Sequence, residues 1–262
     1  GSDGLVVCGT TGESPTLTHD EKLGLFEAVS AEVGGRAKVI AGTGTNNTAE
    51  SITLTREAAD IGVDACLIVT PYYNKPPQNA ILAHFFAIAD ESPVPLIAYD
   101  VPPRTSKRIE RATMVKLAEH ERIVADKDAV GDALETAKLR ADLDRAGHHD
   151  FELYSGDDVM LMPHLAAGVV GVISVCSHIV GDRLKLLMGA WNDGKIEEAK
   201  GIYHDLLPLM STIMGLTTSP IPVKAAVNLI GLDVGEPRLP LVPPTADEAA
   251  KIRAALEAAN LL

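Results

Sequence analysis

Residues 121–132 read ERIVADKDAVGD, and this stretch decides the fold. The apolar run from Ile123 to Ala125 is typical of a buried β-strand. The run ends on Lys127, which lies between two aspartates at the point where the chain turns. The question that this stretch raises for the whole chain is why a strand that packs into the core ends on a lysine.

The same strand-and-helix unit recurs along the chain. Strand patterns cover residues 4–8, 38–41, 65–70, 95–99, 122–127, 152–155 and 170–175. Helical patterns lie between them, after Thr18, Asn47 and Pro77, and near residues 109–119, 131–146 and 157–167. This alternation predicts a parallel sheet. With right-handed crossovers the sheet is either a (β/α)8 barrel or a doubly wound open sheet, and no GxGxxG fingerprint supports the second.

The strand patterns stop after residue 180. Helical patterns then cover residues 183–191, 195–214, 223–230 and 246–259, and a proline-rich connection occupies 233–245. We therefore divide the chain into a barrel, residues 1–180, and an all-helical C-terminal domain, residues 181–262.

The composition excludes several classes of protein. Of the 262 residues, 46% are hydrophobic, and the net charge of −13 argues against a nucleic-acid or anionic-membrane surface. No apolar run approaches the roughly 20 residues needed to span a bilayer. Cys8, Cys66 and Cys176 form no CxxC motif, so we expect buried free thiols and a reducing cytoplasm. The histidines show no metal-binding spacing, so we expect no metal site.

Alternation along the strands places Lys127 at a barrel mouth. In a (β/α)8 barrel the active site lies at the C-terminal ends of the strands. Alternation turns Lys127 inward together with Ile123 and Ala125, and it turns Tyr99 inward, with Ile97, from the preceding strand. Neighbouring strands lie about 4.8 Å apart, so we expect Lys127 and Tyr99 to be close neighbours.

A lysine in that position is suited to covalent chemistry. Desolvation lowers the pKa of a lysine from about 10.4, and the neutral amine attacks carbonyl groups to form a Schiff base. A nearby phenol relays protons. The ordinary alternative is a lysine that reaches solvent from a strand end. The other strand ends are polar as well, in the segments GTTGES (9–14), TPYYN (70–74), YDVPPRT (99–105) and SGDD (155–158).

These segments, in this order, resemble a known family. With Lys127-Asp128-Ala129, GVISV and SPIPVK (219–224), they are similar to the dihydrodipicolinate synthases, also called 4-hydroxy-tetrahydrodipicolinate synthases, within the pyruvate-dependent class I aldolases. The resemblance runs from about residue 3 to the C-terminus. GTTGE and an arginine after YDVP favour the synthase branch over N-acetylneuraminate lyase.

The resemblance implies a reaction and the residues that carry it. Pyruvate condenses with L-aspartate 4-semialdehyde through an imine on Lys127, in diaminopimelate and lysine biosynthesis, without a cofactor. Tyr99, Thr10 and Tyr73 form a proton relay. Tyr73 comes from a neighbouring subunit, which implies a homo-oligomer, a dimer of dimers.

The resemblance also implies substrate and regulatory positions. Thr11 holds the pyruvate carboxylate, Gly156 and the Ile173 carbonyl line the pocket, and Arg104 binds the carboxylate of the semialdehyde. The positions that match a lysine-inhibition site at the subunit interface are Ser14, Pro15, His19, Lys22, Asn46, Glu50 and Tyr72. The alternative is that these seven are simply interface or surface residues.

Two features depart from the family pattern. Only seven strand patterns are present, because the family's first strand and helix have no counterpart before Gly1. We expect an N-terminal segment outside this sequence, and the alternative is an open barrel. Asp126 replaces an apolar residue. We expect it to point to the helix layer, to be satisfied there by a helix N-terminus or a solvated rim, and to raise the pKa of Lys127. The alternatives to the synthase function are a keto-sugar-acid aldolase or a non-catalytic family member.

Overall fold

The strands form one parallel sheet whose order follows the sequence. The computed structural model describes all residues, 1–262. The strands are β1 (Gly4–Val7), β2 (Lys38–Gly42), β3 (Ala65–Val69), β4 (Leu96–Asp100), β5 (Ile123–Asp128), β6 (Glu152–Ser155) and β7 (Gly171–Val172). Each pairs with its neighbours in sequence, in the order β1 to β7. A doubly wound sheet reverses its order part-way, so that alternative is wrong and the winding is that of a barrel.

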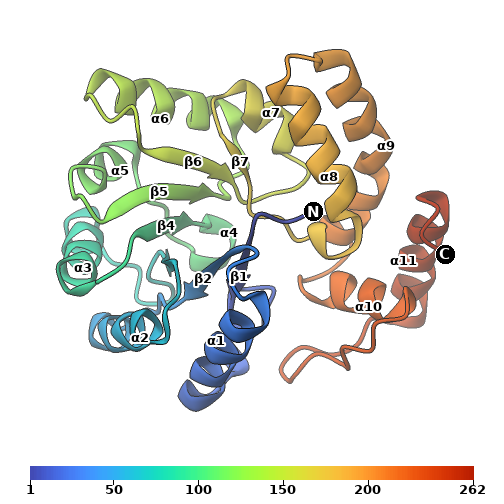
Figure 1. Ribbon diagram of the computed structural model, residues 1–262, viewed down its shortest axis with the longest axis horizontal. Helices are drawn as coiled ribbons and strands as arrows, with labels where there is room; N and C mark the ends of the chain where they lie inside the picture. Colours follow the sequence, from blue (N-terminus) through green and yellow to red (C-terminus); the bar gives the residue numbers. More distant parts are fainter.

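Helices cover the convex face of this curled sheet (Figure 1). They are α1 (His19–Val33), α2 (Thr48–Ile61), α3 (Gln78–Glu91), α4 (Pro102–Thr105), α5 (Arg111–Leu117), α6 (Ala133–Arg145), α7 (Leu161–Ala166), α8 (Ser177–Asn192), α9 (Ile196–Gly215), α10 (Ile221–Leu229) and α11 (Ala246–Ala258), with a 3-10 turn η1 (Ser14–Thr16). None of the helices combines the length and the apolar content that crossing a membrane requires.

Local signals fix the helix ends where the sequence predicts them. The Thr18 hydroxyl accepts from the Glu21 N–H at 3.2 Å, and the Glu21 carboxylate accepts from the Thr18 N–H at 2.8 Å, which is a capping box. Gly34 ends α1 with φ of 53°, a conformation that glycine adopts without strain. The same type of box, built from Thr245 and Glu248, starts α11.

Two predicted elements are shorter than expected, and one helix was not predicted. The strand predicted at 170–175 is only Gly171–Val172, and the helix predicted at 157–167 is Leu161–Ala166. The four-residue helix α4 was not predicted, because its two prolines read equally well as a turn. The boundary that we placed at residue 180 falls inside α8, at Val180, whose φ of −137° is not helical.

The core has two parts on opposite faces of the sheet. The larger part contains 44 buried residues between the sheet and the helices, and it continues from Val7 on β1 to Leu256 on α11. The smaller part lies inside the curl and consists of Leu67, Ile97, Tyr99, Val101 and Ala125. The C-terminal helices therefore share one continuous core with the sheet.

A register shift between β4 and β5 places Ile123 on the face of the sheet opposite to the predicted one. Leu96 pairs with Ile123, whereas Ile97 pairs with Ala125, so Val124 is skipped. Ile123 consequently joins Leu96 in the larger core, and its predicted inward position is wrong. Beyond the shift the alternation holds, and Tyr99 pairs with Lys127 as predicted.

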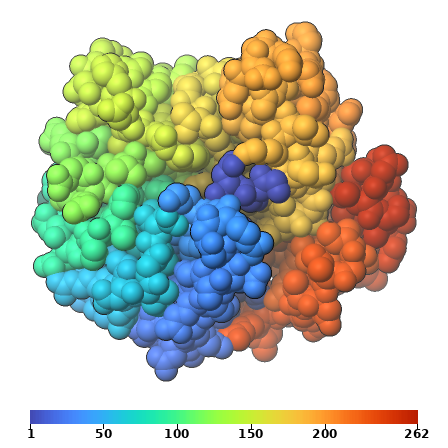
Figure 2. Space-filling view, in the orientation of Figure 1, coloured from blue at the N-terminus to red at the C-terminus, as the bar shows by residue number.

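The N-terminal residues lie against α8 (Figure 2). A Cβ on Gly1 would lie 2.6 Å from the Gly181 carbonyl oxygen, and Asp3 forms an ion pair with Lys185. This contact joins the first strand to the C-terminal helices. The three cysteines are free and buried, as predicted.

Candidate active site

Lys127 lies inside the curl of the sheet, between two tyrosines. Its Nζ lies 4.3 Å from the centroid of the Tyr99 ring, and Tyr99 on β4 is its register partner. Its register partner on the other side is Tyr154 on β6, whose hydroxyl donates to Glu152 at 2.5 Å. The sequence predicted the first neighbour. It missed Tyr154, although alternation in the segment ELYS would have placed this residue inward.

The surroundings of Lys127 favour its neutral form. Desolvation by burial lowers the pKa of Lys127 to about 8, the nearby Asp158 carboxyl acts in the opposite direction, and Arg104 lowers the pKa further. At pH 7.5 a group of pKa 8 is neutral in roughly a quarter of molecules, against about one in a thousand for an ordinary lysine. Lys127 is therefore suited to attack a carbonyl carbon.

Tyr99 is held rigidly beside the lysine. The ring is buried, and both the N–H and the hydroxyl of Thr70 donate to the Tyr99 carbonyl at 2.9 Å. Burial raises the pKa of Tyr99, while the Thr10 side chain and the charge of Arg104 lower it. A phenol that shares a cavity with a second hydroxyl, that of Thr10, suits proton transfer.

Gly156 packs directly against the lysine side chain. A Cβ at this position would lie 3.2 Å from Cε of Lys127 and 2.8 Å from Cβ of Ala129, so only glycine fits without displacement. The Gly156 N–H donates to the Asp128 carbonyl at 2.7 Å, and the Ile173 N–H donates to the Ser155 carbonyl at 2.8 Å. Both predicted pocket positions thus lie at the C-terminal edge of β5, β6 and β7.

A cavity of about 260 Å³ joins several of the predicted residues. Its lining includes Thr10, Tyr99, Arg104, Ser14, Pro15, Lys22 and Tyr72. Three of these belong to the predicted catalytic and substrate set, and four to the predicted regulatory set. Lys127 is not part of this lining, and Thr11 is a half-buried residue next to Thr10 in the turn after β1.

The other regulatory candidates contact neighbouring elements. His19 pairs with Glu57 of α2 at 2.8 Å, and Asn46 donates to the Tyr72 carbonyl at 3.2 Å. The Thr45 hydroxyl lies 3.4 Å from the Glu50 carboxylate.

Tyr73 is exposed and does not line the cavity that contains Tyr99. Its side chain is 88% exposed, and its φ of 69° is a conformation that costs a non-glycine residue energy. The structure therefore does not bring Tyr73 together with Tyr99 within one chain.

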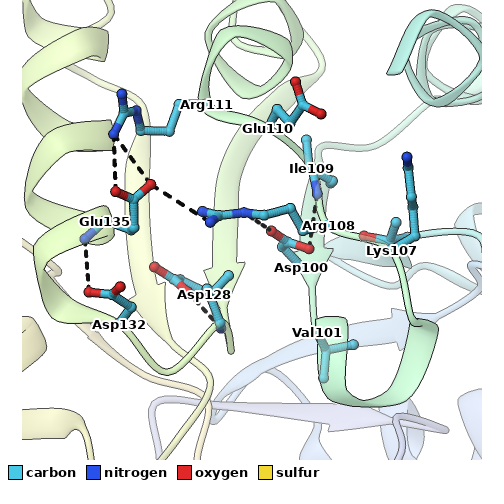
Figure 3. Close-up of polar contacts among 12 residues, drawn as sticks. Asp100, Val101, Lys107, Arg108, Ile109, Glu110, Arg111, Asp128, Asp132 and Glu135 are labelled. Carbon is cyan, nitrogen blue, oxygen red and sulfur yellow. Dashed lines mark hydrogen bonds and ion pairs between the residues drawn. The ribbon is translucent and has the colours of Figure 1, made fainter. Parts of the chain in front are cut away.

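The opposite face of β4 and β5 carries a buried acidic cluster. Asp126 is 1% exposed, and its Oδ1 has no hydrogen-bond partner, so our expectation of a solvated rim is wrong. Burial, with the charges of Asp128 and Asp100, raises the pKa of Asp126 well above its usual value. Arg108 lies between Asp100 and Glu135, at 4.0 and 3.7 Å (Figure 3). The charges that act on the pKa of Lys127 are those of Asp158 and Arg104, not that of Asp126, so the expected effect of Asp126 on the lysine is wrong.

Asp158 is a second residue whose role the sequence analysis missed. It is fully buried and accepts from the N–H groups of Val175 and Cys176 at 2.8 and 3.3 Å and from the Ser174 hydroxyl. These contacts attach the turn after β6 to the start of α8. The segment SGDD indicated a polar strand end. Only the fold shows that its second aspartate, Asp158, lies near enough to Lys127 for its charge to act on the pKa of the lysine.

Comparison with known proteins decides the family. The model of the dihydrodipicolinate synthetase family matches residues 1–259. The chain belongs to this family. A 4-hydroxy-tetrahydrodipicolinate synthase from Desulforudis audaxviator is 48% identical over 262 residues, which are 100% of this chain and 87% of the relative. A protein of the same name from Synechococcus elongatus is 50% identical over 94% of this chain and 81% of its own length.

A solved structure extends the family assignment to three dimensions. The dihydrodipicolinate synthase of Thermotoga maritima superposes with a TM-score of 0.97 at 35% identity, covering 100% of this chain and 88% of the other. The chain is thus an enzyme of the dihydrodipicolinate synthetase family, a lyase with a TIM-barrel type of fold.

Proposed function

We propose that this member of the family condenses pyruvate with L-aspartate 4-semialdehyde, through an imine on Lys127, to give 4-hydroxy-tetrahydrodipicolinate. The observation that carries the proposal is the amine of Lys127, 4.3 Å from the Tyr99 ring centroid, with a pKa lowered to about 8. The product belongs to diaminopimelate and lysine biosynthesis. The free buried thiols are compatible with the cytoplasm.

The first half of the reaction forms the imine. The neutral amine of Lys127 adds to the ketone carbon of pyruvate, and the resulting carbinolamine loses water. Tyr99 donates and recovers the protons that this step moves, with Thr10 as the next hydroxyl and Tyr73 of a neighbouring subunit as the connection to solvent. The lysine itself supplies the covalent site, so the reaction needs no cofactor.

The second half forms the carbon–carbon bond and releases the enzyme. Loss of a methyl proton converts the imine to an enamine, whose carbon attacks the aldehyde carbon of the semialdehyde. The amine of that substrate then adds to the imine carbon and closes the ring. Lys127 leaves as the free amine, so each proton taken up is returned.

Four groups hold the substrates in this scheme. Thr11 binds the pyruvate carboxylate, and Gly156 and the Ile173 carbonyl line its pocket. Arg104 binds the carboxylate of the semialdehyde. Its Nη2 donates to the Ser219 carbonyl at 3.2 Å, which leaves the other guanidinium donors free for a carboxylate.

The substrate assignment is tested with Arg104→Ala. An Arg–carboxylate hydrogen bond contributes about 1.5–3 kcal/mol, so kcat/KM for L-aspartate 4-semialdehyde should fall roughly 10- to 150-fold. Borohydride trapping of pyruvate should persist. Arg104→Lys should restore only part of the loss, because an ammonium group lacks the planar fork.

The paired result separates the alternatives. If trapping falls as steeply as turnover, Arg104 serves the pyruvate site or the fold. If neither changes, the semialdehyde is not the second substrate. A keto-sugar-acid aldolase is then the better assignment, and cleavage of keto-sugar acids is the assay to run.

Tyr73 is the basis for proposing a homo-oligomer, a dimer of dimers. With 88% of its side chain exposed, it becomes a relay member only when a second copy brings it to the site. Mixing inactive Tyr73→Phe chains with inactive Lys127→Ala chains should restore activity as subunits exchange. A fully active monomer in light scattering would contradict this arrangement.

A further inference from the structure

The turn that carries Thr10 and Thr11 has a strained backbone on both sides. Cys8 before it has φ of 57°, and Glu13 after it has φ of 56°. A non-glycine residue in this conformation costs of order 1–3 kcal/mol and persists only where the surroundings hold it. The turn's own bonds are few, with Glu13 N–H to the Thr10 carbonyl at 3.1 Å and Ser14 N–H to the Gly9 carbonyl at 3.4 Å.

The Glu13 carboxylate is held from the far end of the chain. Its Oε2 accepts from Lys224 Nζ on α10 at 2.6 Å, and its Oε1 accepts from the backbone N–H of Arg238 at 2.8 Å. The side chains of Glu13 and Lys224 are only 14% and 16% exposed. Burial opposes the charge of Glu13, but Lys224 and Arg238 outweigh it and hold the pKa of Glu13 below its usual value.

The segment that provides these donors is itself fixed. Lys224 Nζ also donates to the Glu236 carbonyl at 2.9 Å. The Arg238 guanidinium binds both carboxylate oxygens of Glu21 at 2.8 and 2.9 Å and the Thr16 carbonyl at 3.1 Å. The connection between α10 and α11 thus lies against the start of α1 (Figure 1).

The same C-terminal region also contacts the short helix α4, which carries Arg104. Arg104 donates to the carbonyl of Ser219, two residues before α10. Helix α10 and its flanks therefore contact both the turn of Thr10 and the short helix of Arg104, and these two residues line one cavity.

We propose that Lys224 is a positioning residue of the active site: through Glu13 it fixes the turn that presents Thr10 and Thr11 to Tyr99 and to pyruvate. The inference rests on the proposed function, because it concerns the same imine-forming site. Moving a reacting group by about 1 Å from its correct position costs up to about 100-fold in rate. The C-terminal helices are, on this account, part of the machinery that aligns the reacting groups.

The test is the single-turnover rate constant of imine formation at saturating pyruvate, with Lys224→Met in the full chain. This change removes the ammonium group and keeps the length of the side chain. The rate constant should fall about 10- to 100-fold. Partial unfolding lowers the amplitude of a single turnover but not its rate constant, so a merely stabilising role for Lys224 would leave the rate constant unchanged.

Matched variants make the result specific. Lys224→Arg keeps the charge and should recover the rate constant to within about 3-fold of the original. Lys185→Met removes another contact between the C-terminal helices and the N-terminal strand, to Asp3, and should leave the rate constant unchanged. If Lys224→Met does not fold, Glu13→Gln replaces it, because this change keeps the shape of the side chain but removes the charge and turns one of the two acceptor oxygens into an amide donor. Its rate constant should fall about 3- to 10-fold.

Two results would overturn the inference. One is a rate constant within 2-fold of the original in Lys224→Met or, in its place, Glu13→Gln. The other is an equal loss in Lys185→Met. If the original chain forms imine and these results appear, only the positioning role is wrong. If the original chain forms no imine with pyruvate, the proposed function is wrong and this inference is wrong with it.

Discussion

The pKa of Lys127 gives the site a specific pH dependence. Burial lowers this pKa to about 8, so the rate constant of imine formation should rise with pH and level off above about pH 8. Arg104→Ala removes a cation and so favours the protonated amine of Lys127. The midpoint of the pH profile of imine formation should therefore move to higher pH. Trapping rates between pH 6 and pH 10 measure both midpoints. A midpoint near that of an ordinary lysine, about 10.4, would contradict the desolvated position.

Asp126 should make the protein less stable as pH rises. Its pKa is raised in the folded state, so Asp126 lowers the free energy of unfolding once the carboxyl ionises in the unfolded chain. This loss is absent below the unfolded pKa near 4 and grows as pH rises from there. Asp126→Val should therefore stabilise the fold at pH 8 by about 1–3 kcal/mol, which corresponds to about 2–4 °C in Tm per kcal/mol. The gain should be smaller at pH 4. Thermal melts of both proteins at both pH values measure it.

Asp128 provides the matched control for this prediction. Its carboxylate accepts from the Thr136 hydroxyl at 2.5 Å and from the Val130 N–H at 2.9 Å. Asp128→Val leaves both donors without an acceptor and should lower Tm. If Asp126→Val lowers Tm as much as Asp128→Val at pH 8, the account of an unsatisfied buried carboxyl is wrong.

At the scale of elements, the contact between the end of β6 and β5 leaves no room for a side chain at Gly156. In Gly156→Ala the new Cβ would meet Cβ of Ala129 and Cε of Lys127 at 2.8 and 3.2 Å. The lysine amine must then shift, and kcat should fall by at least about 10-fold. Gly201→Ala, in α9 where nothing lies within 4 Å of a new Cβ, should keep kcat and gain about 0.5–1 kcal/mol in stability. Equal kcat in both variants would contradict the close packing.

The elements that the sequence predicted are those with local signals. The capping pair of Thr18 and Glu21 and the terminal glycine Gly34 define α1 without any distant contact. The register shift that moves Ile123 out of the curl depends on how β5 pairs with β4, and a single strand carries no sign of it. The strand β7 is cut short because the chain after Val172 turns towards α8, which is likewise a matter of packing.

At the scale of the whole molecule, the sequence predicted that the strand ends meet at one site. It did not predict the contacts between distant residues that hold this site in place. Lys127, Tyr99 and Gly156 meet because parallel strands end at one edge, and alternation gives their direction. The pair of Glu13 and Lys224 joins residues 211 positions apart, and no local pattern connects them. The desolvation that lowers the pKa of Lys127 likewise depends on packing from the whole fold.

The cavity next to the site predicts weak inhibition by free lysine. Lys22 is buried and lines this cavity with Ser14 and Tyr72. Two cations about 4 Å apart repel by about 1 kcal/mol even in water, and by more in a partly buried cleft. Lys22→His should therefore increase sensitivity to lysine in steady-state assays. Strong inhibition of the original enzyme by low concentrations of lysine would show that the cavity tolerates a second cation.

The most direct test of the central claim is borohydride reduction in the presence of pyruvate, followed by peptide mass spectrometry. The account predicts one reduced pyruvate adduct, on the amine of Lys127, and its loss in Lys127→Ala. Without pyruvate the peptide should be unmodified. An adduct on another lysine, or no adduct on a properly folded protein, would contradict the assignment of Lys127 as the Schiff-base residue.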